Sequence, residues 1–404
     1  MVKRMTFKQF LFILPLLVII AVFSIYPIVS SFVYTVFDYR IYDQQYSSLY
    51  VSSSFNPARF YENCDYIVYY LQDEATVVDE AGKAEIQAIS NEISAFMAPY
   101  QNQTQNQTLS GPEAEKIESF IATIGQRLNT VYNQYPNAEF YHQEDMPILL
   151  EDMQKSFIQP NFSGISNYQR LFKDARFWGA LGITALFMVV SVSLEFVLGM
   201  ALALIMNKAI KGIGLVRTTA LIPWAIPTAV SALIWMYMYD GQSGVVSNIF
   251  AAVQLIPAPE TMLSTFWGMV GSSIISDVWK TTPYMALLLL AGLQTIDRGL
   301  YESAAIDGSG TVNTFFRITL PLMKPSILVA LLFRMLDAFR VYDLLYILTR
   351  GSLESLSVYA YKLMIGQGYY GYGSAVVVAM FACVAIIAFV FVKVLGAEVV
   401  GNDE

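Results

Sequence analysis

Four charged side chains alternate in sign inside an otherwise apolar stretch of the chain. Arg334, Asp337, Arg340 and Asp343 follow one another at steps of three within residues 326–348, a segment long enough to span a bilayer. Residues three apart are neighbours on a helix, so these charges can pair along one slowly rotating stripe. A charge at the bilayer centre costs about 2.5–3.5 kcal/mol, and pairing offsets only part of that cost. The stripe therefore predicts side chains that face protein or a water-filled path.

Three further charged residues lie in other apolar segments, namely Glu195, Asp277 and Lys280. One interpretation makes the charges part of a transport path, with Asp337 or Glu195 as the ion site of a transporter driven by an ion gradient. The other interpretation is structural. It has the stripe tie its helix to a neighbour through Glu195, or through an Asp277–Lys280 pair. The residue types alone leave both interpretations open.

The composition indicates a membrane protein and excludes several kinds of site. Of 404 residues, 55% are hydrophobic and 14% are charged, against about 25% charged in soluble domains. His142 is the only histidine, which excludes a zinc site built on two histidines. Cys64 and Cys383 are the only cysteines and give no disulfide framework. No P-loop motif occurs, so this chain does not bind nucleotide through one. We also expect no cofactor, metal or nucleic-acid partner in this chain.

The hydrophobic pattern predicts an all-α membrane protein with about six transmembrane helices. The apolar segments are residues 9–37, 177–206, 218–239, 266–293, 326–348 and 372–392. The first is too long for a signal peptide, whose apolar part has about 7–15 residues, so we expect it to be uncleaved. Within the third, Pro223 and Pro227 predict a bend that frees backbone carbonyls.

Lysine and arginine mark the cytoplasmic loops of membrane proteins. Applied to this chain, the rule places both termini and two internal loops in the cytoplasm of a cell membrane. The residues that decide this are Lys3, Arg4 and Lys8, then Lys208, Lys211 and Arg217, then Arg298, Arg317 and Lys324, and finally Lys393.

Residues 38–175 form a large insertion after the first helix and differ from the rest of the chain. Residues 38–174 hold 19 acidic and 8 basic side chains, in a chain of net charge −8. Residues 76–98 and 112–132 show helical apolar spacing and predict a helical hairpin joined by a polar linker at 102–108. The topology predicts that this block, which is of domain size, lies outside the cytoplasm. The expected domains are therefore 1–37, 38–175 and a membrane core at 176–404.

A short polar stretch between two apolar segments carries the most specific motif. Residues 302–306 are mostly good helix formers and Gly308 can end that helix, after which residues 311–318 can start a second one. We expect Pro321 and Pro325 to stop the second helix before the next apolar run. The result is two short helices at a membrane face, available to a partner.

This motif resembles the EAA loop of permease subunits in binding-protein-dependent ABC importers, in the carbohydrate branch that includes maltose-type permeases. The resemblance rests on Glu302, Ala304, Gly308 and Pro321, with Gly292-Leu293-Gln294 and Tyr301 beside them; Ser303 stands where the family usually has alanine. It implies the type I importer permease fold, with residues 294–325 as a cytoplasmic coupling loop. The residues that it implies for ATPase coupling are Glu302, Ser303, Ala304, Ala305, Asp307, Gly308, Ile318, Leu320 and Pro321.

The same resemblance implies a function. The chain would be a prokaryotic transport subunit, not an enzyme, for a sugar or oligosaccharide, with a substrate path near Arg334, Asp337, Phe339 and Arg340. Its expected partners are two ATPase subunits that hold ATP and magnesium, a second permease subunit of different sequence, an extracytoplasmic solute-binding protein, and membrane lipid. Two other classes stay open, namely the ion-driven transporter above and a membrane-anchored receptor that uses the acidic block.

Overall fold

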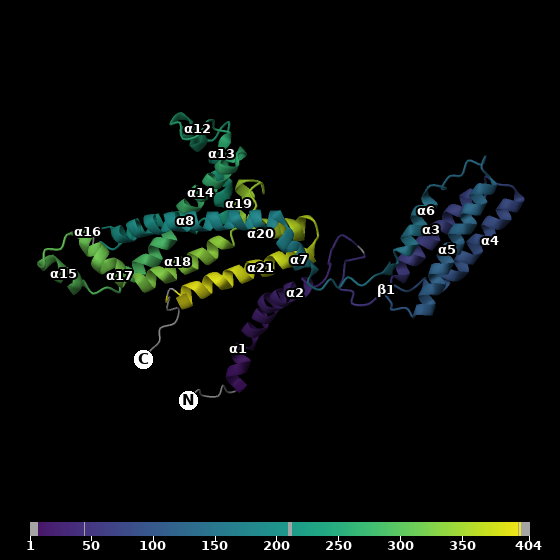
Figure 1. Cartoon of the computed structure of the whole chain (residues 1–404), viewed down its shortest axis with the longest axis horizontal. Coiled ribbons are helices and arrows are strands. Elements are labelled where there is room, and N and C mark those ends of the chain that lie inside the picture. Colours follow the sequence, from purple (N-terminus) through teal and green to yellow (C-terminus); the bar gives the residue numbers. More distant parts are fainter. Residues whose placement is uncertain (1–6, 44, 209–211, 395, 397–404) are drawn as a thin grey trace. The chain divides into compact units, whose positions relative to one another are not determined.

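The computed structural model is mostly helical and describes residues 7–43, 45–208, 212–394 and 396. The predicted topology signals at Lys3, Arg4 and Lys211 lie outside the described residues. The chain divides into two units. The membrane unit takes the described residues within 1–32, 168–367 and 372–404, and the insertion unit takes those within 33–167 and 368–371. Each unit is described here by itself (Figure 1).

Three helices of the described chain are long and apolar enough to cross a membrane. The first runs through α1 (Phe7–Ile20), a π-helical turn (Ala21–Ile25) and α2 (Tyr26–Tyr34). The second is α8 (Ala175–Met206), and the third is α21 (Tyr370–Phe389), which a π-helical turn (Val390–Val394) continues. Each of the three coincides with a segment that the hydrophobic pattern predicts.

Two further apolar segments are bent helix pairs. In the first, α9 (Ile213–Ala220) and α10 (Ile222–Ala225) meet α11 (Thr228–Met238) at 86°. This confirms the predicted bend, because Pro227 has no N–H with which to continue the helix. In the second, residues Thr311–Leu322 meet α18 (Lys324–Phe339) at 70°. If each pair is one span, the described chain has up to five.

The remaining predicted segment is α14 (Phe266–Leu293), whose bounds agree with the prediction but whose composition is too polar to count as a span. Its polar residues are buried, among them Ser272, Ser276 and Lys280. The helix packs closely on α8, since a Cβ added at Gly199 would lie 2.8 Å from the Cγ of Met285. Small residues let membrane helices approach in this way.

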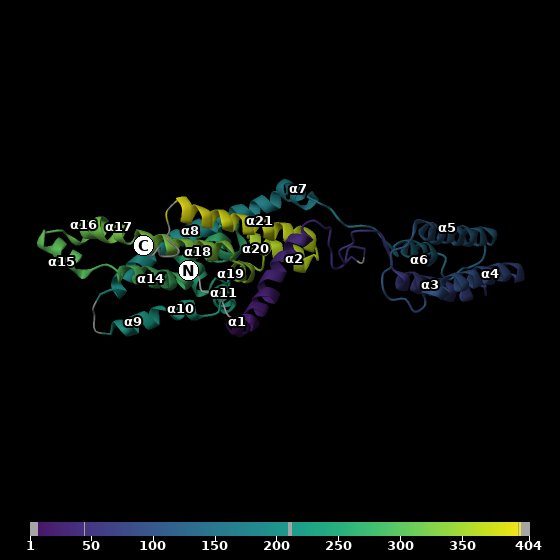
Figure 2. The ribbon, with the colours of Figure 1, turned by 90° about the horizontal axis from the view of Figure 1, so that it is seen from below.

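The predicted coupling loop lies at one end of the membrane unit and contains α15 (Arg298–Ile306) (Figures 1 and 2). After it come α16 (Thr311–Thr314), a π-helical turn (Phe315–Thr319) and α17 (Leu320–Leu322). The prediction that Pro321 stops this segment is wrong, because the helical run continues to Leu322 and breaks at Met323. Pro321 and Pro325 instead occupy the first turns of α17 and α18, where a missing N–H is tolerated.

Shorter helices complete the membrane unit. They are α12 (Val245–Ala252), α13 (Thr261–Ser264), α19 (Asp343–Leu348) and α20 (Leu356–Tyr361), the last continued by a π-helical turn (Lys362–Gly366). One more, α7 (Ser166–Lys173), precedes α8.

The insertion unit is built from four helices that lie side by side (Figures 1 and 2). They are α3 (Pro57–Glu74), α4 (Glu80–Met97), α5 (Gly111–Gln134) and α6 (Asp145–Gln154), with a short 3-10 turn at Ala98–Tyr100. The helices predicted within 76–98 and 112–132 are confirmed as α4 and α5. Ile89, Ile93 and Ile124 are fully buried between the helices with Cys64. Burial raises the pKa of the Cys64 thiol to about 12, so this cysteine stays protonated at neutral pH.

The two chain ends of the insertion unit are paired with each other. Strand β1 (Ser54–Phe55) is antiparallel to β2 (Phe157–Ile158), and Phe37 forms an antiparallel bridge with Phe162. Asn161 reinforces this pairing, since its Oδ1 accepts from the N–H of Tyr50 at 2.9 Å. The same side chain donates to the carbonyls of Asp38 and Ser48. The chain therefore leaves this unit beside the point where it enters.

Candidate functional site

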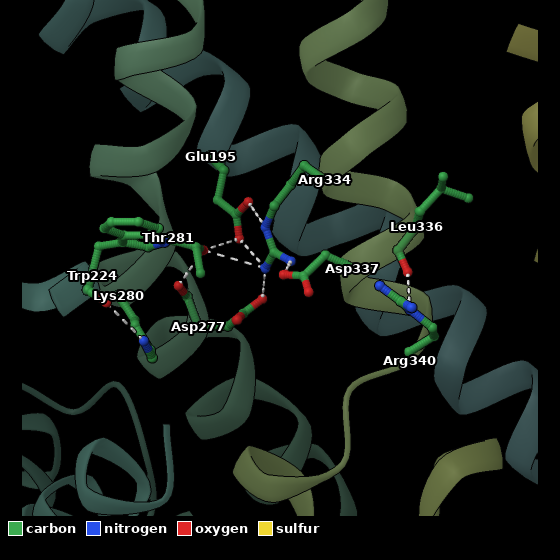
Figure 3. Close-up of polar contacts among 9 residues, drawn as sticks. All are labelled: Glu195, Trp224, Asp277, Lys280, Thr281, Arg334, Leu336, Asp337 and Arg340. Atoms are coloured by element: carbon green, nitrogen blue, oxygen red, sulfur yellow. Dashed lines mark hydrogen bonds and ion pairs between the residues drawn. The ribbon is translucent and has the colours of Figure 1, made fainter. Parts of the chain in front are cut away.

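A single arginine joins three helices in the interior of the membrane unit (Figure 3). Arg334 of α18 donates from Nε to Glu195 Oε2 at 2.5 Å and from Nη2 to Glu195 Oε1 at 2.9 Å. Its Nη2 also reaches Asp277 Oδ2 of α14 at 2.5 Å, and its Nη1 reaches Asp337 Oδ2 at 2.9 Å. Thr281 of α14 donates to Glu195 Oε1 at 2.7 Å. The guanidinium is thus held by carboxylates of α8, α14 and α18.

The cluster around Arg334 is buried in the membrane unit. Arg334 is 1% exposed, Glu195 is 0% exposed and Asp277 is 6% exposed. A buried charge is tolerated when it is paired and its remaining donors are hydrogen-bonded. The three carboxylates meet that condition for Arg334. The contact with Glu195 is the one that the structural interpretation of the intramembrane charges expects.

The charged stripe does not continue along one helix as predicted. Only the Arg334–Asp337 pair forms, because α18 ends at Phe339 and α19 starts at Asp343. Arg340 lies at the helix end, where its Nε donates to the carbonyl of Leu336 at 3.1 Å. A distant side chain also supports the break, since Ser355 Oγ donates to the carbonyl of Val341 at 3.0 Å. The carbonyl has a partner outside the helix, so the chain can leave the helical path.

A cavity of about 510 Å³ adjoins the cluster. The side chain of Asp337 is 64% exposed, although its Oδ2 accepts from Arg334. The residues that line the cavity are Trp224, Thr228, Asp277, Lys280, Thr281, Arg334, Asp337, Ala338, Arg340, Val341, Tyr342, Asp343 and Leu344. Phe339 is buried at 3% exposure and is not among them. The structure thus brings Arg334, Asp337 and Arg340 to one cavity and directs Phe339 into the packing.

Most of the residues that line the cavity have no role in the sequence-based prediction of the path. Among them are Trp224, Lys280 and Tyr342. Tyr342 stacks on Tyr346 with ring centres 5.2 Å apart. Lys280 donates to two backbone carbonyls, so of the tie predicted through Asp277 and Lys280 only Asp277 contacts α18, through Arg334. A local signal existed for Lys280, an isolated cation in an apolar segment, and for Trp224, which follows Pro223 at the predicted bend.

The coupling loop has the predicted helix–glycine–helix form. Asp297 caps the start of α15 by accepting from the N–H of Gly299 at 2.8 Å. At the other end Gly308 adopts φ 73°, a left-handed conformation that favours glycine. The N–H of Ser309 then returns to the carbonyl of Ala304 at 2.9 Å. Tyr301 OH lies 3.2 Å from Thr319 Oγ1, which connects α15 to the π-helical turn after α16.

The predicted coupling residues differ in exposure. Exposed are Glu302, Ser303, Ala305, Asp307, Gly308 and Pro321; half-buried are Ile318 and Leu320; and Ala304 is buried. Beside them two apolar side chains face solvent, Ile306 at 86% and Val312 at 71% exposure. Exposed apolar residues of this kind mark interaction surfaces when they gather in one place. A second cavity of about 650 Å³, lined in part by Ala305 and Phe315, lies next to this loop.

Residues 195–400 match the family described as binding-protein-dependent transport system inner membrane component. This range contains every member of the ionic cluster and the whole coupling loop. The chain belongs to this family. As in its other members, it is a permease subunit and not an enzyme, and ATP hydrolysis belongs to a separate subunit.

Curated relatives of this permease include two that are more than 40% identical. The trehalose transport system permease protein SugA of Mycobacterium tuberculosis is 42% identical over 244 residues, which are 60% of this chain and 78% of the relative. The trehalose/maltose transport system permease protein MalF of Thermococcus litoralis is 44% identical over 239 residues, which are 58% of this chain and 79% of the relative. The family resemblance drawn from the EAA-like motif is therefore confirmed.

Solved structures agree on the fold of the permease. A bacterial ABC transporter involved in the import of the acidic polysaccharide alginate has a chain with TM-score 0.51 and 23% identity, covering 70% of this chain and 98% of that chain. A second alginate transporter structure, in complex with an alginate pentasaccharide-bound periplasmic protein, gives TM-score 0.50 and 21% identity, covering 70% and 99%. At these identities the likeness shows the fold alone.

Proposed function

We propose that this chain forms the translocation path of an ATP-driven importer for a sugar or short oligosaccharide, with trehalose and maltose as the first candidates. The observation that carries the proposal is the identity of 42% and 44% to permeases named for trehalose and for trehalose/maltose. The cavity beside Arg334 supports it. Carboxylates, an ammonium and tyrosine provide partners for sugar hydroxyls, while the rings of Trp224 and Tyr342 suit the apolar face of a sugar.

We also propose a number of membrane spans and an orientation for the chain. We place six spans in the membrane, with α14 as the one whose polar residues face protein. A helix of 28 residues is about 42 Å long, which exceeds the roughly 30 Å hydrocarbon core. Both termini then lie in the cytoplasm, the insertion follows the first span on the outside, and the loop at 294–325 lies in the cytoplasm. The cell membrane is that of a prokaryote.

The proposed assembly has this permease, a second permease subunit of different sequence, two ATPase subunits that bind ATP and magnesium, and a solute-binding protein outside. The exposed face of α15, with Glu302 and Ile306, contacts an ATPase subunit. Closure of the ATPases pushes on this loop, and the spans rock between outward and inward access around the cavity.

Uptake into proteoliposomes tests the function. The whole importer, reconstituted with its solute-binding protein, is expected to accumulate labelled trehalose or maltose at least tenfold faster with ATP than without it. A protonophore is expected to leave this uptake unchanged. Uptake that needs no ATPase subunit, collapses with the proton gradient and is lost in Asp337→Asn or Glu195→Gln would instead establish the ion-driven transporter.

The insertion unit is the proposed docking surface for the solute-binding protein. Deletion of residues 40–160 is expected to lower uptake at least tenfold and to abolish co-purification of the binding protein. Association with the ATPase is expected to persist, because the coupling loop belongs to the other unit. The two associations are measured by co-purification in detergent, and uptake is measured after the same preparation is reconstituted into proteoliposomes. Unchanged uptake together with unchanged binding-protein association would remove this role from the insertion.

A further inference from the structure

The broken span α9–α11 leaves backbone carbonyls without helical donors at its bend. The chain turns by 86° between Ala225 and Thr228, where Ile226 is extended with ψ 131°. Pro227 follows and has no N–H, so the carbonyl of Pro223 loses its helical partner as well. Within a membrane such carbonyls must find partners from elsewhere in the protein.

Lys280 of α14 supplies the partner. Its Nζ donates to the carbonyl of Trp224 at 3.2 Å and to that of Ile226 at 2.9 Å. The side chain is only 7% exposed. One helical turn later on α14, the ring of Tyr284 stacks on Trp224, with centres 5.4 Å apart and an interplanar angle of 7°. Thus α14 holds the end of α10 at two points one turn apart.

The same contact borders the cavity. Trp224, Thr228 and Lys280 all line it, and Figure 3 shows Lys280 and Trp224 on the opposite side of the cluster from Arg340. An ammonium has three donors. Two of them reach the carbonyls at the bend, which leaves a third for the cavity.

The other cations that line the cavity are bound differently. Arg334 is surrounded by carboxylates, and Arg340 is exposed and donates to a carbonyl of its own helix. In the described part of the chain, Lys280 is the cation of this cavity whose hydrogen bonds go to a bent span. Any displacement of Lys280 would therefore change both the cavity wall and the bend.

We propose that Lys280 is a positioning residue for transport, which fixes the bend of α9–α11 against α14 and offers its third N–H to a hydroxyl of the transported sugar. The inference rests on the proposed function. A hydroxyl in the cavity completes the hydrogen bonds of the ammonium, so the group that holds the bend has a third partner in the loaded permease and lacks it in the empty one. Loss of the ammonium uncouples cavity occupancy from the position of the span.

The test compares variants of the whole importer in proteoliposomes, with labelled trehalose and maltose as probes. Lys280→Met keeps an unbranched side chain that is one atom shorter and removes every donor, and Lys280→Arg keeps several donors. The exposed Lys173 of α7, changed to Met, is the matched control. We expect Lys280→Met to reduce sugar transported per ATP hydrolysed at least tenfold, Lys280→Arg to restore most of it, and Lys173→Met to leave it unchanged.

The amount of sugar transported per ATP hydrolysed separates positioning from a purely structural role. A loss of folded complex lowers uptake and ATP hydrolysis together, so it leaves this ratio unchanged. If the importer with Lys280→Met does not assemble, Lys280→Gln is the variant to measure. The glutamine amide can still donate to the carbonyls at the bend but has no third donor for the sugar. A wild-type ratio in an assembled Met or Gln variant overturns the inference. Wild-type protein that transports neither sugar with ATP overturns the proposed function instead.

Discussion

Arg334→Met is expected to lower the stability of the membrane unit by about 3–5 kcal/mol, the cost of breaking a buried ion pair by removing one partner. Glu195 and Asp277 would keep their burial and lose the cation that both contact. Methionine fills much of the volume, so the loss comes from uncompensated charge and not from a cavity. Thermal unfolding of the detergent-purified importer measures it, and we expect little assembled complex at growth temperature.

Arg340→Met is the matched control for stability. Arg340 lies six residues further along, is exposed and donates only to the carbonyl of Leu336 in the described structure, so we expect a change within about 0.5 kcal/mol. A second variant separates charge from shape: Arg334→Met combined with Glu195→Gln and Asp277→Asn removes the unpaired carboxylates and should regain part of the loss. If the Arg334→Met importer unfolds at the same temperature as the wild type, the cluster does not hold the helices together.

Glu302→Lys is expected to abolish association with the ATPase subunit and to reduce ATP-driven uptake at least tenfold. Glu302 is exposed on α15, four residues before the exposed Ile306. Reversal of its charge would place a cation on the surface that we propose for docking, where a wrong charge costs specificity and affinity. Because the residue is exposed, the fold should be unaffected. Co-purification of the ATPase and sugar uptake are the two measurements.

Glu115→Lys provides the same charge reversal at an exposed site on α5 of the insertion unit. It should leave ATPase association intact, so a general effect of charge on expression or solubility can be separated from a local one. Normal association and intact uptake in Glu302→Lys would remove the coupling role from this loop and favour a transporter that works without an ATPase.

Much of the helical framework could be predicted from the sequence because its causes are local. The bounds of α14 follow from an apolar run, the bend at Pro227 from a missing N–H, and the end of α15 from Gly308. The EAA-like motif, which identified the family, is also a local pattern. In the insertion, apolar spacing predicted α4 and α5, while α3 was missed because tyrosines and charges obscure its apolar face.

The site depends on contacts between distant residues, which no local pattern contains. Arg334 and Glu195 are 139 residues apart in the sequence, and Lys280 and Trp224 are 56 apart. The helix break after Phe339 contains no glycine or proline that would predict it. It is supported by a hydrogen bond from Ser355, a residue outside the helix. The sequence therefore predicted which residues are unusual in a membrane, and the structure was needed to say which ones they contact.

The paired ends of the insertion have a consequence for how such permeases diversify. Phe37 and Phe162 face each other across an antiparallel bridge, and Cα atoms of such partners are about 4.5–5.5 Å apart. A tight turn can cover that span, so the block between them can be gained, lost or exchanged as a cassette without stretching the chain on either side. The docking surface that we propose for the solute-binding protein can then change with this block, while the membrane unit is kept.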